Sequence, residues 1–263
     1  MNELILIKLG GSLITDKSKP YTPRRQVIFR LAKEIKSALK TYKGKVILVN
    51  GSGSFGHSAA AKYKTQAGII NKNSIKGFPL VADAAVQINR IVITEFFKLG
   101  LPVVSFSPLS FITSSGRKLD KVFSDPIKKA LDLGLIPVIY GDVIMDEKSG
   151  FCIYSGEKSI SILADKFKED YTKIRIIFCG DTDGVLDRDG NTVEMIDRKV
   201  FNKLMQNIKG SSATDVTGGM LHKVEESLIL ANRGIKSLIV NGKKEKELQK
   251  AISGKNYKGT LIK

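Results

Sequence analysis

The stretch Glu3-Leu4-Ile5-Leu6-Ile7-Lys8-Leu9-Gly10-Gly11-Ser12 decides the fold. It is a nearly continuous apolar run with a single lysine close to its end, and two glycines follow at once. A short apolar run bounded by glycine is typical of a strand that is buried on both faces, as in the parallel sheets of α/β proteins. The sequence therefore predicts that the chain opens with a central strand and a tight turn.

Outward from this stretch, short apolar runs alternate with amphipathic stretches. The strands that we expect are Lys45–Val49, Leu101–Phe106, Ile136–Tyr140, Phe151–Tyr154, Lys173–Cys179, Lys236–Val240 and, as a short edge strand, Gly259–Ile262. The expected helices are Pro23–Lys40, Asp83–Leu99, Glu157–Lys168, Asp197–Asn207, Thr217–Arg233 and Lys244–Ser253. This alternation predicts an α/β fold, a three-layer sandwich with a central, mainly parallel sheet, as one domain over residues 1–263.

Composition excludes several classes of protein. The 263 residues are 42% hydrophobic, which is typical of a globular chain. No apolar run approaches the roughly 18 residues that a membrane-spanning helix needs. The first residues lack the basic and small-residue pattern of a signal peptide, so we expect a cytoplasmic protein. Cys152 and Cys179 have no Cys-x-x-Cys spacing, so neither a disulfide framework nor a zinc site is expected, and no residue is assigned to a metal.

The formal net charge is +17, from 43 Lys and Arg against 26 Asp and Glu. A nucleic-acid-binding module would concentrate its basic residues on one stripe, often with stacking aromatic residues. Here the lysines are scattered through every expected element, and the run Lys243–Glu247 mixes both signs. The charge therefore indicates a solvated lysine-rich surface, with no nucleic acid and no membrane as partner.

The first glycine turn has the chemistry of a phosphate site. Gly10 and Gly11 let the backbone approach a phosphate closely, and successive N–H groups can surround its oxygens. Lys8 and Lys17 would place positive charges beside it. Taken alone, however, two glycines after a strand are equally compatible with a simple tight turn.

The second glycine-rich stretch is Gly51-Ser52-Gly53-Ser54-Phe55-Gly56-His57. It matches the dinucleotide pattern G-x-G-x-x-G, but that fold needs an acidic residue about 20 positions later to bind the ribose. No acidic residue occurs between His57 and Asp83. We therefore interpret the stretch as a loop that binds an anion, with the imidazole of His57 at its end.

Two further turns complete the pattern. Asp181, in the turn Gly180–Val185, could bind a ribose or orient a lysine, although Asp-x-Asp-Gly is also common turn chemistry. Thr217 has the character of a helix N-cap, so the following Gly218 and Gly219 would present open N–H groups at a positive helix end. Lys223 lies one and a half turns later and could reach a phosphate there.

In this order, the motifs resemble the amino acid kinase family across nearly the whole chain. The family-level match rests on Lys8-x-Gly-Gly-Ser12, Asp181-x-Asp-Gly-Val185 and Gly218-Gly-Met-x-x-Lys223. Within the family, the stretch that ends at His57 is similar to the isopentenyl phosphate kinases, as are Lys17, Tyr140-Gly-Asp-Val143 and Ser155-Gly156. The resemblance implies an ATP- and Mg²⁺-dependent kinase of isoprenoid precursor synthesis that forms a homodimer.

The resemblance also implies a role for each matching residue. Lys8 would contact the transferring phosphoryl group, Lys17 would stabilise the transition state, and His57 would complete the catalytic set. The ATP-binding residues would be Lys8, Gly10, Gly11, Ser12, Gly53, Asp181, Gly219 and Lys223. The residues that bind the acceptor phosphate would be Ser52, His57 and Gly156. The N-terminal part of the domain would then bind the acceptor and the C-terminal part ATP.

The chain departs from the family pattern at three positions. Ser52 replaces a usual glycine, Glu157 a usual aspartate, and Gly180 a usual threonine. Alternatives to this assignment are a fosfomycin-type phosphonate kinase and a non-catalytic nucleotide sensor, although a sensor would need fewer lysines.

The residues agree with phosphoryl transfer independently of the resemblance, because glycine turns, lysines and a helix N-terminus supply alignment and charge neutralisation. A phosphate monoester already presents an anionic oxygen at neutral pH and needs no general base. Candidates to line a pocket for the acceptor tail are Val86, Ile88, Ile91, Val92 and Phe96, with an ordinary core role as the alternative.

Overall fold

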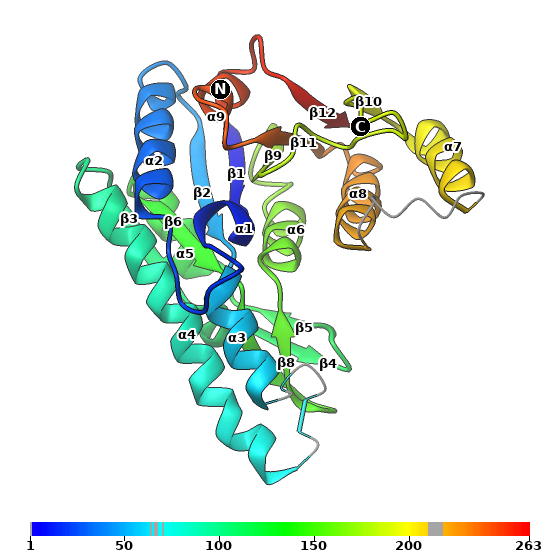
Figure 1. The fold of residues 1–263 in the computed structure, drawn as a ribbon. Coiled ribbons are helices and arrows are strands. Elements are labelled where there is room, and N and C mark those ends of the chain that lie inside the picture. The colour runs from blue at the N-terminus through cyan, green and yellow to red at the C-terminus, as the bar shows by residue number, and fades with distance from the viewer. Residues whose placement is uncertain (1, 64, 66–67, 70, 210–217) are drawn as a thin grey trace.

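The computed structural model describes residues 2–63, 65, 68–69, 71–209 and 218–263 (Figure 1). The strands are β1 (Glu3–Leu9), β2 (Lys45–Asn50), β3 (Val103–Phe106), β4 (Ile112–Ser115), β5 (Lys118–Val122), β6 (Ile136–Tyr140), β7 (Asp142–Asp146), β8 (Gly150–Tyr154), β9 (Lys173–Gly180), β10 (Met195–Ile196), β11 (Lys236–Asn241) and β12 (Gly259–Ile262). The helices are α1 (Gly11–Ile14), α2 (Arg25–Leu39), α3 (Gly53–Tyr63), α4 (Lys72–Phe97), η2 (Pro108–Ser110), α5 (Asp125–Asp132), α6 (Gly156–Lys166), α7 (Arg198–Lys209), α8 (Gly218–Ala231) and α9 (Glu247–Ser253).

The main sheet has the strand order β10-β12-β11-β9-β1-β2-β6-β3. Its described pairings are parallel except the one between β11 and β12, so the expectation of a mainly parallel sheet is confirmed. β1 lies between β9 and β2, which makes the opening strand central, as predicted. β12 is not an edge strand, because the two-residue strand β10 pairs with its outer side.

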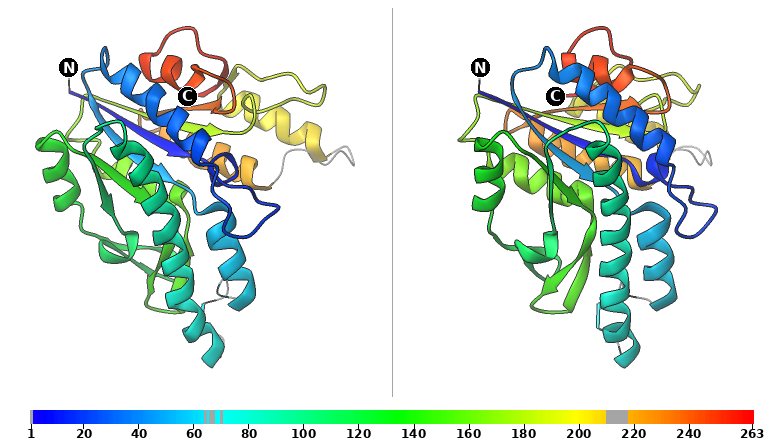
Figure 2. Two further views of the ribbon diagram at one scale, coloured as in Figure 1. Left: turned by 60° about the vertical axis from the view of Figure 1, so that its left-hand side comes forward. Right: turned by 90° about the vertical axis from the view of Figure 1, so that its left-hand side faces the viewer.

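Side chains of β1 alternate between the two faces of the sheet, as the pleat of a strand requires. Ile5 and Ile7 pack in one apolar cluster with residues of α2, α3, α4 and α9. Leu4 and Leu6 pack in a second cluster with residues of α5, α6, α7 and α8. Helices thus cover both faces of the sheet, and the three-layer architecture is confirmed (Figures 1 and 2).

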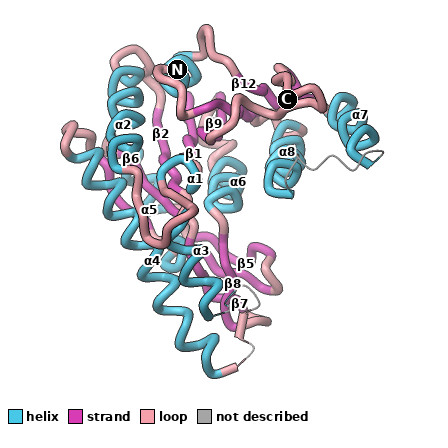
Figure 3. The backbone as a smooth tube through the Cα atoms, in the orientation of Figure 1, coloured by secondary structure: helices cyan, strands magenta, loops and turns pink. Residues whose placement is uncertain are grey.

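A second, four-stranded sheet in the order β5-β4-β7-β8 was not expected from the sequence. The predicted strand Phe151–Tyr154 belongs to it as part of β8, which pairs with β7 in antiparallel register. In the tube view, this sheet lies beyond the main sheet, next to α3 and α4 (Figure 3). The second sheet therefore lies next to the end of α3 and the beginning of α4.

Several helices differ from their predicted bounds. α4 begins at Lys72 and not at Asp83, because the side chain of Asn71 caps it by accepting hydrogen bonds from the backbone N–H groups of Asn73 and Ser74. α9 begins only at Glu247, since the preceding Lys246 has a left-handed backbone conformation with φ of 65°. Within the described ranges, the structure contains no helix with the length and apolarity that crossing a membrane requires.

Candidate active site

The glycine turns meet at the carboxyl ends of three neighbouring strands. Gly10 follows β1 and Gly51 follows β2, while Gly180 ends β9. The Gly10 N–H donates to the Cys179 carbonyl at 2.8 Å, and the Gly51 N–H donates to the Leu9 carbonyl at 3.0 Å. Open α/β sheets bind their ligands at this edge, where adjacent turns separate. The topology therefore brings the predicted motifs to one place.

The first two turns pack backbone against backbone. A Cβ atom on Gly11 would lie 2.7 Å from the Gly53 nitrogen, which is too close for any side chain. Gly53 has φ of +52°, and a Cβ there would lie 2.1 Å from Oγ1 of Thr15. That hydroxyl donates to the Gly11 carbonyl and accepts from the Ser54 N–H. The glycines are thus required by this close approach and not only by the turns.

His57 lies on a helix, which corrects the prediction of a loop. Gly53 to His57 form the beginning of α3, whose buried side includes Phe55 and Ala59. The anion-binding feature predicted here is therefore a helix N-terminus, whose positive end and free N–H groups favour an anion. A Cβ on Gly56 would lie 2.3 Å from Oγ of Ser52, so the serine packs against this glycine one turn away.

Lys8 and Glu157 form an ion pair across the site. Lys8 is 6% exposed at the end of β1, and its Nζ lies 2.7 Å from Oε1 of Glu157 in the first turn of α6. Burial by itself would raise the pKa of Glu157, but the charge and hydrogen bond of Lys8, with the charge of Lys223, hold that pKa below its usual value. Glu157 therefore stays ionised and fixes the ammonium group of Lys8.

Two further cations complete the basic set. Lys223 lies on α8, and its pKa is lowered by burial and by the neighbouring charge of Lys8. Lys17 is exposed in the loop after α1. The pKa of His57 is lowered by partial burial and by the charge of Lys17, so its imidazole is uncharged at neutral pH. Three lysines with one carboxylate partner make the site suitable for polyanions.

A cavity of about 410 Å³, the larger of the two that concern this site, is lined by every predicted catalytic, ATP-binding and acceptor-phosphate-binding residue. Its lining includes Lys8, Gly10, Gly11, Ser12, Lys17, Ser52, Gly53, His57, Gly156, Asp181, Gly219 and Lys223. The residues come from β1, from the loops that follow β1, β2, β9 and α1, and from the beginnings of α1, α3, α6 and α8. Added Cβ atoms on Gly180 and Gly219 would meet nothing within 4 Å, so the space beside these glycines is open.

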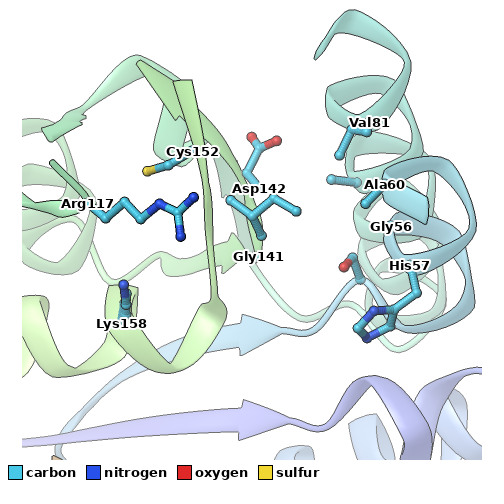
Figure 4. A pocket seen from close by; sticks show the side chains of 12 residues that line it. Gly56, His57, Ala60, Val81, Arg117, Gly141, Asp142, Cys152 and Lys158 are labelled. Atoms are coloured by element: carbon cyan, nitrogen blue, oxygen red, sulfur yellow. The ribbon is translucent and has the colours of Figure 1, made fainter. Parts of the chain in front are cut away.

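The smaller cavity, about 290 Å³, adjoins the first (Figure 4). Its lining consists of Ser52, Gly56, His57, Ala60, Val81, Ala85, Arg117, Gly141, Asp142, Cys152, Ile153 and Lys158. Ser52, His57 and Ile153 line both cavities. In Figure 4, Ala60 and Val81 of the two helices lie on one side, and Arg117 and Lys158 on the other.

The smaller cavity is lined by α4, but not by the residues of this helix that were predicted as candidates for a tail pocket. Along the described α4, none of the five predicted residues lines the smaller cavity, whereas Val81 and Ala85 do. Ile88, Val92 and Phe96 face the sheet and are fully buried in the apolar cluster. The structure thus supports the alternative, an ordinary core role, for these three.

Sequence reasoning predicted Ser52 and His57 but gave no role to three other polar residues of the smaller cavity. Arg117 lies in the turn between β4 and β5, and Lys158 follows Glu157 on α6. Asp142 is 4% exposed, and its carboxylate accepts hydrogen bonds from the Val143 N–H and the Ser107 hydroxyl. Burial raises the pKa of Asp142 to about 6. Arg117 gave no signal in the sequence, because the second sheet that brings its turn to the cavity was not predicted.

The Gly180–Val185 turn divides its two acids. Asp181 lines the larger cavity. Asp183 points to the end of β11, where it accepts from Nδ2 of Asn241 at 2.8 Å and pairs with Nζ of Lys244 at 2.7 Å. The predicted N-cap Thr217 lies outside the described residues. Among the described residues, no group of three or more His, Cys, Asp or Glu could hold a metal ion.

Known proteins and solved structures similar to this chain were found in three comparisons. The model of the amino acid kinase family matches residues 3–241. The isopentenyl phosphate kinase of Methanocaldococcus jannaschii is 37% identical, and that of Methanothermobacter thermautotrophicus 31%, each over 98% of both chains. A solved isopentenyl phosphate kinase structure has a TM-score of 0.82 and 28% identity, covering 98% of this chain and 100% of its own. Carbamate kinase from Giardia lamblia shares the fold, with a TM-score of 0.69 and 16% identity over 99% and 98% of the chains.

Proposed function

The chain belongs to the amino acid kinase family, and we propose that it is an isopentenyl phosphate kinase. It transfers the γ-phosphoryl group of ATP to isopentenyl phosphate and releases ADP and isopentenyl diphosphate. The observation that carries this proposal is that Ser52 and His57 line both cavities. A donor in the larger cavity and an acceptor in the smaller one would bring their phosphates together at these two residues, which is the alignment that phosphoryl transfer needs.

On the donor side, ATP occupies the larger cavity. Its phosphates lie against the Gly10–Ser12 turn and Gly53, where the glycines let a phosphate approach the backbone closely. Gly219 and Lys223 of α8 and the carboxylate of Asp181 complete this side. Lys8 contacts the transferring phosphoryl group, and Glu157 holds its ammonium in position.

On the acceptor side, the phosphate of isopentenyl phosphate binds Ser52, His57 and the N-terminus of α6 at Gly156. His57 donates a hydrogen bond as a neutral imidazole, in keeping with its lowered pKa. An anionic phosphate oxygen attacks the γ-phosphorus, and the bond to the β,γ-bridging oxygen breaks. Lys17 stabilises the charge that is redistributed during this step. No proton has to be removed from the acceptor, which is why no base is required.

The five-carbon tail lies in the smaller cavity against Ala60, Val81 and Ala85. In this arrangement the acceptor contacts mainly the N-terminal half of the chain. Much of the ATP site comes from the C-terminal half, although Lys8 and the first two glycine turns contribute from the N-terminal half.

Mg²⁺ accompanies ATP in this proposal. This ion commonly keeps several waters and is held by substrate phosphates with one or two carboxylates, and Asp181 is a suitable carboxylate on the cavity wall. We further propose a homodimer, from the family resemblance, and a cytoplasmic location. Cys152 and Cys179 are free and buried, which is compatible with a reducing compartment.

The test is ADP release by the purified protein with Mg²⁺ and ATP. Isopentenyl phosphate should stimulate release strongly, whereas isopentenol, which lacks the phosphate, should not. Fosfomycin serves as the second acceptor. Stimulation by fosfomycin without stimulation by isopentenyl phosphate would assign the site to a phosphonate kinase, and nucleotide binding without turnover would assign it to a sensor.

A further inference from the structure

Two buried asparagines connect the acceptor side of the site to the main sheet. Asn50 is the last residue of β2, and Asn89 lies on α4; each is 1% exposed. The Asn89 Nδ2 donates to Oδ1 of Asn50 at 3.0 Å, and Oδ1 of Asn89 accepts from the Ser105 hydroxyl of β3 at 2.6 Å. Asn89 therefore connects α4 to two strands through both ends of its amide.

Asn50 extends this network to both cavities. Its Nδ2 donates to the carbonyl of Gly51, which lines the larger cavity, at 3.4 Å. Its own carbonyl accepts from the N–H of Gly141, which lines the smaller cavity, at 3.0 Å. A buried network whose members find partners favours one arrangement of its elements, because any shift would leave polar groups unpaired.

The position of Asn89 on α4 relates this network to the acceptor. Val81, Ala85 and Asn89 are spaced by four residues and lie on one side of the helix. The first two form the wall of the smaller cavity, and the third bonds to the residue that precedes Gly51 and Ser52. α4 runs alongside α3, which carries His57 (Figure 2). The distance between the tail wall and the phosphate-binding residues thus depends on the Asn89 contact.

We propose that Asn89 is a positioning residue for the acceptor. It acts through Asn50 by holding the Gly51–Ser52 turn at a fixed distance from Val81 and Ala85. An acceptor whose tail lies against α4 then presents its phosphate to Ser52 and His57. This inference rests on the proposed function, since it assigns the smaller cavity to a phosphate monoester with a short tail.

The test compares the variant Asn89→Leu with a control on the same helix. Leucine has nearly the same shape, but it leaves Oδ1 of Asn50 and the Ser105 hydroxyl without their partner. We expect KM for isopentenyl phosphate to rise about three- to tenfold, the loss for one to two hydrogen bonds, with a much smaller change in KM for ATP. Ser105→Ala, which removes only one partner of Asn89, should raise the same KM about twofold.

The control is Glu95→Gln. Glu95 is 2% exposed on α4, and its partners Arg25 and Lys98 lie away from both cavities. Loss of the Glu95 charge should lower the melting temperature without changing KM for isopentenyl phosphate.

Binding of isopentenyl phosphate to the wild type, measured by calorimetry, separates the positioning role of Asn89 from the proposed function. No binding and no turnover by the wild type would contradict the proposed function.

Binding by the wild type together with an unchanged acceptor KM in Asn89→Leu would overturn the positioning role alone. Equal changes in Asn89→Leu and Glu95→Gln would overturn it as well, because they would reflect general destabilisation. If Asn89→Leu does not fold, Ser105→Ala decides, and an unchanged acceptor KM in that variant contradicts the proposal.

Discussion

The Nζ of Lys8 lies 2.7 Å from Oε1 of Glu157, so the lysine near the end of the central strand is fixed by a carboxylate from the first turn of α6. The side chains are 8% and 30% exposed, so water and salt screen the attraction between the two charges less than at the surface. Lys223 is close enough to affect the same carboxylate. Glu157 thus holds the ammonium group of Lys8 in place and also interacts with the charge of Lys223.

We predict that Lys8→Ala and Lys17→Ala each lower kcat far more than they raise KM for ATP. Both charges are proposed to act where negative charge is redistributed in the transition state, and such groups affect kcat. The expected loss is on the order of 100-fold, by comparison with the removal of one oxyanion donor. Steady-state kinetics will measure it, with the exposed Lys121 of β5 changed to Ala as the control. A normal kcat with a raised KM for ATP would refute the transition-state role of that lysine.

We predict that His57→Gln and His57→Asn retain much more activity than His57→Ala, because the amides keep an N–H donor. The Ala variant should lose affinity mainly for isopentenyl phosphate, by about 1.5–3 kcal/mol. Since the pKa of His57 is lowered, its imidazole is already neutral at pH 7, and kcat/KM should not change through its titration between pH 7 and 9. Equal inactivation of all three variants with unchanged acceptor affinity would instead indicate that His57 transfers a proton.

We predict that Ala85→Phe raises KM for isopentenyl phosphate at least tenfold, on the order of the 1–3 kcal/mol that a pocket contact contributes, and leaves KM for ATP nearly unchanged. Ala85 lines only the smaller cavity, so a larger side chain there would occupy the space of the tail. The matched control is Val86→Phe, because Val86 is 39% exposed on the same helix and lies outside the cavity. If Ala85→Phe and Val86→Phe changed KM for isopentenyl phosphate equally, the smaller cavity would not hold the tail.

We predict that Asp142 makes folding less favourable as pH rises from 4 to 7. Its folded pKa of about 6 lies above the usual 3.8, so the folded protein keeps the proton where the unfolded chain has lost it. Stability from this group is therefore complete below pH 4 and decreases through pH 6, by about 2–3 kcal/mol. Urea unfolding at pH 4.5 and 7.5 should show this decrease in the wild type relative to Asp142→Asn. Identical pH dependence of the two proteins would exclude it.

The apolar patterns predicted the main sheet because its strands are buried on both faces. The strand around Lys8 and the turn after it could be predicted without a structure, because an apolar run that ends in glycines is typical of a buried strand followed by a tight turn. Of the second sheet only Phe151–Tyr154 was predicted, and β5 was missed because its side chains are mostly exposed. A strand without an apolar face leaves no periodic signal.

The glycine-rich stretch at Gly53 was predicted as a loop for a similar reason. Glycine and serine have low helix propensity, and the helix is stabilised by tertiary contacts of Phe55, Ala59 and Ala60 with the core. The first half of α4 contains Gly77 and Pro79, which obscured its start. As a result, Val81 fell outside the predicted helix, although it lines the smaller cavity together with Ala85.

The central claim is phosphoryl transfer to a phosphate oxygen, and ³¹P NMR of one reaction mixture tests it most directly. With ATP, Mg²⁺ and isopentenyl phosphate, the account predicts ADP together with two coupled doublets of a diphosphate monoester, in equal amounts, as the acceptor singlet disappears. Lys8→Ala should form both products far more slowly. ADP accompanied only by inorganic phosphate, with the acceptor singlet unchanged, would contradict the account.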